Sequence, residues 1–384
     1  MVGTKAKTFE NGTAMQWAVP FLVALLAFAV LVGVGKPARA SIEFVDAAGR
    51  KVHLDAPARR IVTNESLLLL SLALIDPKPV ERLAGWARPQ RIDKGVYEAF
   101  KKRFPAIDEI PVVGAVVPES ASAEAILSVK PDLFVVRIWQ PGWQGLAAQL
   151  AAAGVPVIFL DGPAVADRGA GEATVFAIEL LGKAIGRTEQ AKAFGSFVRN
   201  RFRNVAERIA TIDARPSVLI DVHAGTLCCY TPGADNRITQ YLEHAGGRSI
   251  ADGVPGYDGQ LSAEYVLGAD PDIYIGTGGP RFAETGGLFV GAGVDQARAR
   301  KSLESVVGRN FLNGLTAVGE GRAYAISHQL SISALDVLAM ESFAKWLHPD
   351  LFTDLEPAAT LDEINRRFLP VPLRGAFWVG LRTE

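Results

Sequence analysis

The chain has 384 residues, of which 49% are hydrophobic and 21% charged, and its formal net charge at pH 7 is −1. These values place it among ordinary globular proteins and make it long enough for two hydrophobic cores. The balanced charge argues against nucleic acid as a partner, because nucleic-acid-binding proteins carry a clear excess of Lys and Arg.

The first forty residues have the features of a secretory leader. Lys5 and Lys7 precede an apolar stretch over residues 15–35, which ends in a short segment with proline and small residues before Ala40. The pattern predicts a signal peptide over residues 1–40 with cleavage after Ala40, which leaves 36 basic and 40 acidic residues. The alternative is an uncleaved membrane anchor, since the apolar stretch is near the length that spans a bilayer.

The segment after the leader alternates between strand and helix patterns. Residues 42–54 predict a hairpin around a glycine turn, and residues 61–63 begin a buried strand followed by a helix over 66–74. Further short β-type runs and helical segments continue the alternation. The runs lie at 83–86, 112–114, 133–137 and 155–160, and the helices at 97–104 and 145–153. This alternation favours parallel pairing, so residues 41–171 are predicted to form an N-terminal α/β lobe.

A long helical segment over residues 172–210 follows. Its second part carries an apolar stripe at helical spacing, which predicts packing against the body of the protein. The stripe consists of Phe194, Val198, Phe202, Val205 and Ile209. Gly182 and Gly186 are the candidates for a break into two helices.

A second α/β lobe is predicted over residues 211–349. Its strands are expected at 218–222, 273–276 and 323–326, and a closing helix at 334–347. Residues 350–384 form a C-terminal extension to which the sequence assigns no role. The predicted fold is therefore α/β, with two Rossmann-like lobes of parallel-rich sheets joined by one long helix and a ligand cleft between the lobes.

One supersecondary unit occurs twice, once in each lobe. Ser122-Ala123-Glu124 leads to Lys130-Pro131-Asp132-Leu133, and Ser262-Ala263-Glu264 leads to Asp270-Pro271-Asp272-Ile273. In each copy the serine suits an N-cap, the glutamate lies at the positive end of a helix, and the proline ends the helix before a strand. Each lobe is thus predicted to carry one acid on the first turn of a short helix.

The two cysteines are neighbours, Cys228 and Cys229. Ordinary disulfide geometry does not fit adjacent residues easily, so the sequence favours two partly buried thiols on a strand over a vicinal disulfide. No spacing of Cys or His indicates a structural zinc site.

The ordered set of motifs resembles the periplasmic substrate-binding proteins of the iron-siderophore, haem and cobalamin ABC importer class, in which one long helix bridges two lobes. The matching residues include Asp46-x-x-Gly49-Arg50, Val113-Gly114, both Glu-to-Pro-Asp units, Gly246-Gly247 and Lys345-Trp346-Leu347-His348-Pro349.

This resemblance implies a monomeric periplasmic receptor without an intrinsic cofactor or catalytic residues, which hands its cargo to an inner-membrane ABC permease dimer. In similar proteins one glutamate on each lobe docks on the permease, and by motif these are Glu124 and Glu264. The alternative is that each glutamate only complements its helix dipole.

Cargo is expected at loops beyond the carboxyl ends of the strands. Arginine and aromatic residues in these loops suit a bulky, partly anionic iron(III) chelate, such as a ferric siderophore. The candidates are Trp86, Arg88, Arg137, Trp139, Trp143, Tyr230, Tyr257, Arg281 and His328, with Arg91, His223, Asp258 and Gln329 beside them.

Other cargoes and functions stay open from the sequence. Haem would need an axial ligand, for which Tyr230, Tyr257 and His328 are available, and direct metal ligation by His328 or Tyr257 is an alternative to hydrogen bonding. Cobalamin or an oxyanion such as molybdate are further candidates in the same class. A secreted hydrolase lacks support because no Gly-x-Ser-x-Gly or His-Glu-x-x-His motif occurs. A receptor that makes only protein contacts is a third class.

Overall fold

The computed structural model describes residues 1–6, 41–114, 117–137, 142–169, 171–225, 227–309 and 311–382. The chain divides into two units, Met1–Ser41 and Ile42–Glu384, and the described helices and strands all lie in the second. The predicted signal peptide falls almost wholly outside the described residues, and so does its cleavage site. Within the described part of the chain, no helix is long and apolar enough to cross a membrane.

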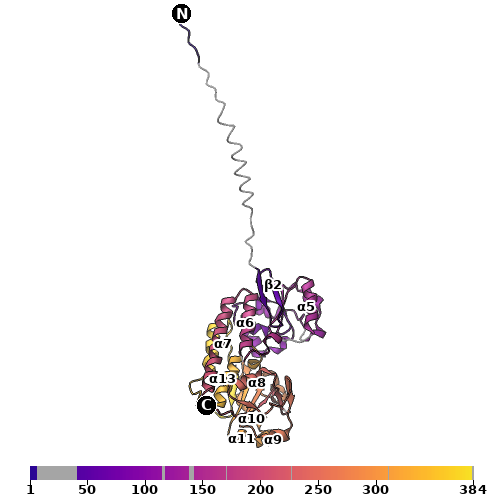
Figure 1. The fold of residues 1–384 in the computed structure, drawn as a ribbon, viewed down its shortest axis with the longest axis vertical. Helices are drawn as coiled ribbons and strands as arrows, with labels where there is room; N and C mark the ends of the chain where they lie inside the picture. Colours follow the sequence, from indigo (N-terminus) through magenta and orange to yellow (C-terminus); the bar gives the residue numbers. More distant parts are fainter. Residues whose placement is uncertain are drawn as a thin grey trace. The chain divides into compact units, whose positions relative to one another are not determined.

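The first lobe contains a four-stranded parallel sheet in the order β4-β3-β5-β6. Every strand residue of this sheet is buried, as expected for a parallel sheet covered on both faces. A hairpin precedes the sheet and helices follow its strands, which confirms the predicted α/β pattern (Figure 1). The elements are β1 (Ile42–Val45), β2 (Lys51–Leu54), β3 (Ile61–Thr63), α2 (Leu68–Ala73), β4 (Leu83–Gly85), α3 (Lys94–Arg103), α4 (Ala123–Ser128), β5 (Leu133–Val136), α5 (Trp143–Ala152) and β6 (Val157–Phe159).

Two helices, not one, occupy the predicted linking segment. Helix α6 (Glu172–Ala184) packs against α7 (Thr188–Ile209), and the chain turns at Gly186, whose φ of +72° favours glycine. Gly182 permits the close approach of the helices, because an added Cβ there would lie 2.3 Å from the Cβ of Ala191. The predicted apolar stripe of α7 is buried, and α7 leads into the second lobe (Figure 1).

The second lobe contains a five-stranded sheet in the order β15-β13-β11-β7-β9. Four strands are parallel, and β15 is antiparallel at the edge. Helix α13 packs against both α7 and α8. The elements are β7 (Ser217–Asp221), β8 (Tyr230–Pro232), α8 (Arg237–His244), β9 (Arg248–Ser249), β10 (Asp258–Gln260), α9 (Ala263–Ala269), β11 (Ile273–Gly278), β12 (Gly291–Ala292), α10 (Gln296–Val307), α11 (Thr316–Gly319), β13 (Ala323–Ser327), α12 (His328–Ser331), α13 (Asp336–Leu347), α14 (Pro357–Arg367), β14 (Gly375–Ala376) and β15 (Trp378–Gly380).

The parallel strands of the two lobes have the same order. Across the sheet of the first lobe the order is β4-β3-β5-β6, and across the sheet of the second lobe it is β9-β7-β11-β13. In both sheets the parallel strand that comes second along the chain is at the edge, followed by the first, the third and the fourth. The order therefore reverses between β3 and β5 and again between β7 and β11. In open α/β sheets, ligands bind beyond the carboxyl ends of the strands at such switch points.

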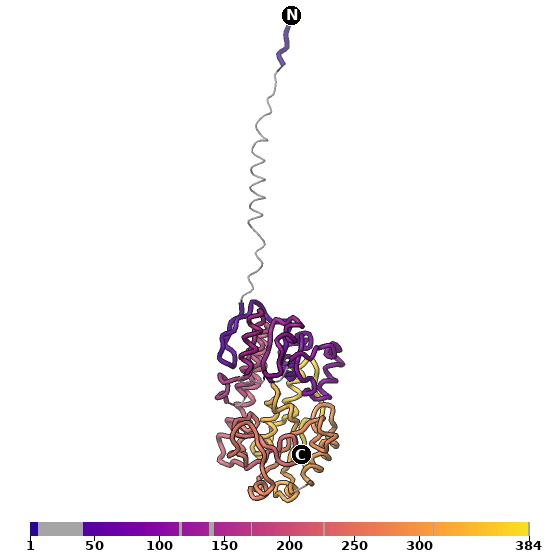
Figure 2. The backbone as a smooth tube through the Cα atoms, turned by 90° about the vertical axis from the view of Figure 1, so that its right-hand side faces the viewer, coloured from indigo at the N-terminus to yellow at the C-terminus, as the bar shows by residue number. Residues whose placement is uncertain are grey.

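The C-terminal extension is part of the second lobe. Its last strand, β15, pairs with β13 and so completes the edge of the sheet, while β14 pairs with β12. Figure 2 shows the C-terminus within the orange second lobe. The extension thus has a structural role that the sequence did not assign.

The duplicated unit has the predicted local structure in both lobes. The Ser122 hydroxyl accepts a hydrogen bond from the Ala125 amide at 3.1 Å, and the Ser262 hydroxyl accepts one from the Tyr265 amide at 3.1 Å. Both serines are therefore N-caps, of α4 and α9 respectively.

The aspartate of each copy holds the start of a neighbouring strand. Asp132 accepts hydrogen bonds from the amides of Arg59 and Arg60, both at 2.8 Å, just before β3. Asp272 accepts from the amide of Ser217 at 2.8 Å, at the start of β7. The repeated motif thus ties the first strand of each lobe to its third strand.

Candidate ligand-binding site

A cavity of about 170 Å³ lies between the two lobes. Its walls come from the segments that follow β4 in the first lobe and β7, β11 and β13 in the second, all at the carboxyl ends of strands. The lining residues are Arg88, Arg91, Asp93, His223, Gly278, Gly279, Arg281, Phe282, His328, Gln329 and Ile332.

Three guanidinium groups face this cavity and give it a positive character. Arg88 and Arg91 follow β4, and Arg281 follows β11. Arg91 is oriented by an ion pair at 3.2 Å with Glu65, whose side chain is fully buried and which lies two residues after β3. Because guanidinium groups donate in fixed directions, this cluster suits a ligand rich in anionic oxygens.

Two imidazole rings lie together on the wall of the second lobe. The ring centroids of His223 and His328 are 4.1 Å apart, and Thr277 contacts both residues: its hydroxyl lies 3.0 Å from the His223 amide and 3.2 Å from Nδ1 of His328. Nη2 of Arg281 lies 3.0 Å from Nε2 of His223. A guanidinium can only donate, so Nε2 of His223 is the unprotonated nitrogen of its ring.

The electrostatic environment keeps both imidazoles neutral. Burial, with the positive charges of Arg281 and Arg91, lowers the pKa of His223 to about 4. Burial, with the neighbouring His223 and Arg281, holds the pKa of His328 well below its ordinary value. At neutral pH each ring therefore carries one nitrogen lone pair. That of His223, on Nε2, accepts from Arg281, so His328 is the ring with a lone pair to offer to a ligand or to a metal ion.

Asp93 is the one acid on the described part of the cavity wall. Burial raises its pKa to about 7, although the positive charge of Arg281 acts in the opposite direction. Near neutral pH the carboxyl is therefore divided between its protonated and ionised forms, and the charge of the cavity depends on pH.

Several contacts connect the lobes around the cavity. The amide of Asp93 donates to Oε1 of Gln329 at 2.8 Å, and Arg237 of α8 pairs with Asp161 at 3.1 Å. The guanidinium of Arg137 donates to the carbonyl of Ile332. These contacts hold the two walls together in the structure.

The structure brings together only some of the residues that the sequence proposed. Arg88, Arg281 and His328 line the cavity, with Arg91, His223 and Gln329 beside them. Arg137 does not line it but contacts Ile332, which does. Trp139 lies outside the described residues.

The two described tryptophans of the prediction are core residues. Trp86 is 1% exposed and packs against Tyr97 of α3, because the chain after β4 forms a further bridge with Val112 and directs the indole inward. Trp143 was expected in a loop but begins helix α5, where it is fully buried against Phe134 of β5. Neither indole can cover a ligand in this arrangement.

The predicted tyrosines are exposed but lie away from the cavity wall. Tyr230 is 43% exposed, and its hydroxyl donates to Asp258 across the β8–β10 pair. Tyr257 is 61% exposed, in the segment before β10. In the described structure the cavity therefore contains histidine but not tyrosine as a candidate ligand for a metal.

Sequence reasoning missed two acids of the site, Glu65 and Asp93. Glu65 lies two residues after β3, so its position at a switch point was a usable signal. Asp93 stands five residues beyond Arg88 in an irregular segment. Its place on the cavity wall depends on contacts with the second lobe, which the sequence does not display.

The cysteines also differ from the expectation of free thiols. Cys228 and Cys229 form a disulfide in the segment before β8. The segment returns to the end of β7, where the amide of Val222 donates to the carbonyl of Tyr230 at 2.6 Å, and both sulfur atoms lie within 4.8 Å of an Asp221 oxygen.

The proposed docking glutamates are both exposed. Glu124 and Glu264 occupy the first turns of α4 and α9, one in each lobe. Their exposure fits either a docking role or stabilisation of the helix dipole, so the docking role stays a prediction.

Residues 82–330 match the model of the family described as periplasmic binding protein. A vitamin B12-binding protein from Photorhabdus laumondii is 30% identical over 162 residues, which are 42% of this chain and 55% of that protein, so the match spans little more than half of that relative.

Solved structures share the fold over most of the chain. The TroA-like periplasmic binding protein FepB from Veillonella parvula is similar with a TM-score of 0.79 and 24% identity, over 89% of this chain and all of the other. The molybdate-binding protein MolA from Haemophilus influenzae has a TM-score of 0.66 and 15% identity, over 87% and 99% of the two chains. With the two-lobed fold and the extent of the family match, the chain belongs to the periplasmic binding protein family.

Proposed function

We propose that the protein is the substrate-binding component of an ABC importer and that it captures a small anionic iron(III) chelate in the cavity between its lobes. The observation that carries this proposal is the combination of three guanidinium groups with two neutral imidazoles at the carboxyl ends of the strands. The guanidiniums would bind the carboxylate, catecholate or hydroxamate oxygens of the chelate.

The imidazoles are the groups of the cavity that could coordinate iron. An unprotonated imidazole nitrogen is a suitable ligand for iron, and both rings are kept neutral at neutral pH. His328 would then occupy a position of the cargo's iron that a chelator with few donor atoms leaves open, since Nε2 of His223 already accepts from Arg281.

An oxyanion such as molybdate is the second candidate, and the size of the cavity favours it. A volume of about 170 Å³ is below the roughly 300–1,000 Å³ typical of sites for drug-sized molecules. Haem, cobalamin or a bulky ferric siderophore would therefore require the lobes to separate, and only a small chelate fits the cavity as it stands. The partial match to a vitamin B12-binding protein is an argument for cobalamin, but the small volume of the cavity is a stronger argument against it.

Thermal unfolding with a ligand panel tests the cargo. Ferric citrate, a ferric hydroxamate, a ferric catecholate, molybdate, haem and cyanocobalamin would be titrated against the purified protein. A ligand that binds the folded state raises Tm with concentration, with about 2.7 kcal/mol of stabilisation at 100 times Kd. A response to haem or cobalamin alone would contradict the proposal, and a response to molybdate alone would select the second candidate.

A charge variant locates the binding site. Arg281→Gln removes one guanidinium from the cavity. We expect it to weaken binding of the ligand that raises Tm in the panel by about 10- to 100-fold, as for a lost charge-assisted hydrogen bond. Arg248→Gln is the matched control, because Arg248 is exposed in the same lobe and outside the cavity. Equal affinities of both variants would place the site elsewhere.

The second half of the proposal concerns delivery to an inner-membrane permease. Glu124 and Glu264 are exposed at corresponding positions of the two lobes, which matches a two-fold symmetric partner. Replacing both by alanine should leave ligand affinity unchanged and reduce association with the permease. The control replaces two other exposed acids, Glu98 and Glu284. Normal association of the Glu124/Glu264 variant would contradict the docking role.

A further inference from the structure

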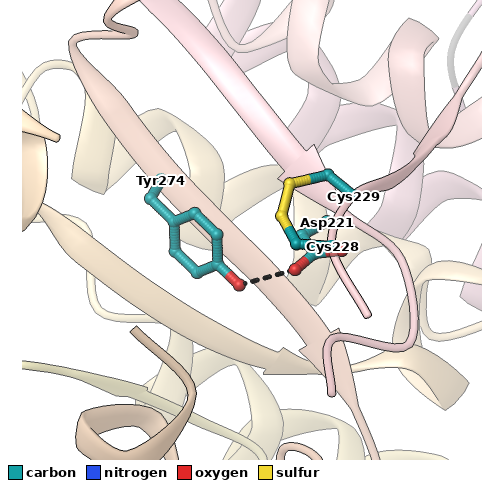
Figure 3. The surroundings of a disulfide bond; sticks show 4 residues. All are labelled: Asp221, Cys228, Cys229 and Tyr274. Carbon is teal, nitrogen blue, oxygen red and sulfur yellow. Dashed lines mark hydrogen bonds between the residues drawn. A yellow bond between two sulfur atoms is a disulfide. The ribbon is translucent and has the colours of Figure 1, made fainter. Parts of the chain in front are cut away.

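The Cys228–Cys229 disulfide lies in a cluster that the cargo site does not use. The pair follows β7 along the chain and precedes β8, and Figure 3 shows it beside Asp221 and Tyr274. Cys229 is fully buried, whereas Cys228 is partly exposed and therefore accessible to a reductant. None of these four residues belongs to the described lining of the cavity.

Asp221 is a buried acid with one oxygen unaccounted for. It is the last residue of β7 and is 1% exposed. Oδ2 accepts a hydrogen bond from the Tyr274 hydroxyl at 2.9 Å, whereas Oδ1 has no partner in full hydrogen-bond geometry among the described residues; the backbone amide of Tyr230 lies near the carboxyl and acts to lower its pKa. A buried carboxylate oxygen without a partner is costly, so a specific reason for its presence is expected.

The two sulfur atoms and this carboxylate lie near enough to one another to bind one metal ion together. One oxygen of Asp221 and the Sγ atoms of Cys228 and Cys229 all lie within 4.8 Å of one another. Around a tetrahedral Zn²⁺, sulfur lies about 2.3 Å and carboxylate oxygen about 2.0–2.2 Å from the ion, so two ligand atoms are roughly 3.5–4 Å apart. Occupation of such a site requires the cysteine side chains to rotate after the S–S bond breaks, so that the sulfurs separate from bonding distance to this spacing.

We propose that reduction of the Cys228–Cys229 disulfide creates a binding site for one thiophilic divalent cation, with the two thiolates and the Asp221 carboxylate as ligands. A dithiol reductant supplies two electrons and two protons: the S–S bond breaks, two thiols form, and the reductant becomes a disulfide. When the cation binds, the two thiol protons pass to solvent and two metal–sulfur bonds form. The site is independent of which cargo the cavity holds.

Cadmium binding in the two redox states tests this proposal on the wild-type protein. Protein reduced with a phosphine, which is then removed without air, is titrated with Cd²⁺ beside the untreated protein. Bound metal is measured by mass spectrometry and by the thiolate-to-cadmium charge-transfer absorption. We expect one Cd²⁺ per reduced chain and none on the oxidised chain, whereas equal uptake in both states or no uptake after reduction would overturn the proposal.

Variants identify the ligands. Asp221→Asn keeps a side chain that can accept from Tyr274 but removes the anionic ligand, and should weaken Cd²⁺ binding by more than about tenfold. Asp235→Asn, at an exposed acid of the same lobe, should bind like the wild type. Binding of Asp221→Asn as tight as wild type overturns the role of the carboxylate. Alkylation of the reduced wild type is the separate test of the two thiolates and must abolish the uptake; uptake that survives alkylation would overturn the proposal.

Discussion

Replacement of Asp93 by asparagine tests the electrostatics of the cavity without knowledge of the cargo. Burial raises the pKa of Asp93 from 3.8 to about 7, so the folded protein keeps a proton on this carboxyl that the unfolded chain releases between about pH 4 and 7. The contribution of protonated Asp93 to stability is complete below about pH 4 and is lost as the pH rises through 7. Asparagine resembles the protonated form and does not titrate.

The expected size follows from the shift. About three pKa units correspond to roughly 4 kcal/mol, and partial access of solvent to the cavity reduces this to about 2 kcal/mol. Unfolding entropy of about 2.1 cal/mol/K per residue, over the roughly 340 residues from Ile42 to Glu384, converts 2 kcal/mol into about 3 °C. Asp93→Asn should therefore melt about 3 °C above wild type at pH 8 and together with it at pH 4.

The assay is differential scanning calorimetry of the two proteins without ligand between pH 4 and pH 8. Asp167→Asn serves as the control, because Asp167 is an exposed acid outside the cavity and should give the same Tm difference from wild type at every pH. A lower Tm of Asp93→Asn at pH 8, or a difference that does not vary with pH, would refute the reasoning and mean that Asp93 is already ionised in the ordinary range.

Three further substitutions have distinct expected outcomes. Trp143→Ala should lower the free energy of unfolding by about 3–5 kcal/mol in urea titrations, since the indole is fully buried, and a loss of less than 1 kcal/mol would contradict its place in the core. Asp272→Ala should cost about 1–3 kcal/mol in the same titration, because it leaves the Ser217 amide without its acceptor; no change would mean that this bond does not hold β7. Gly95→Ala should weaken cargo binding and increase the radius of gyration in X-ray scattering, because the new Cβ would lie 2.0 Å from the carbonyl oxygen of Ala292 in the other lobe. An unchanged radius with unchanged binding would argue against close contact of the lobes at this point.

Local features of the fold were predictable because they depend on neighbours in the sequence. The serine caps of α4 and α9 are set by residues within three positions, and burial of the β5 and β11 runs follows from their apolar composition. The repeat also indicated that both lobes are built alike, and the shared strand order agrees with this. The end of α6 near Gly186 followed from the conformational freedom of glycine.

The composition of the candidate site depended on packing between distant segments. Arg88 and Arg281 face one cavity only because the loops after β4 and β11 belong to lobes that meet there. A tryptophan after a strand can point toward a cleft or into the core, and the sequence does not distinguish the two, so Trp86 was misplaced.

The sequence by itself determined the class of protein: two α/β lobes, each with the same capped helix carrying an exposed acid, because hydrophobic period, caps and turn residues act over a few neighbours. Only the tertiary structure decided the chemistry of the interior. The neutral histidine pair and the raised pKa of Asp93 arise from burial and from contacts between residues far apart in the sequence, as with Arg281 beside His223 and Asp93 beside Gln329. The disulfide is local in sequence, but its place beside the buried Asp221 depends on the return of its segment to β7.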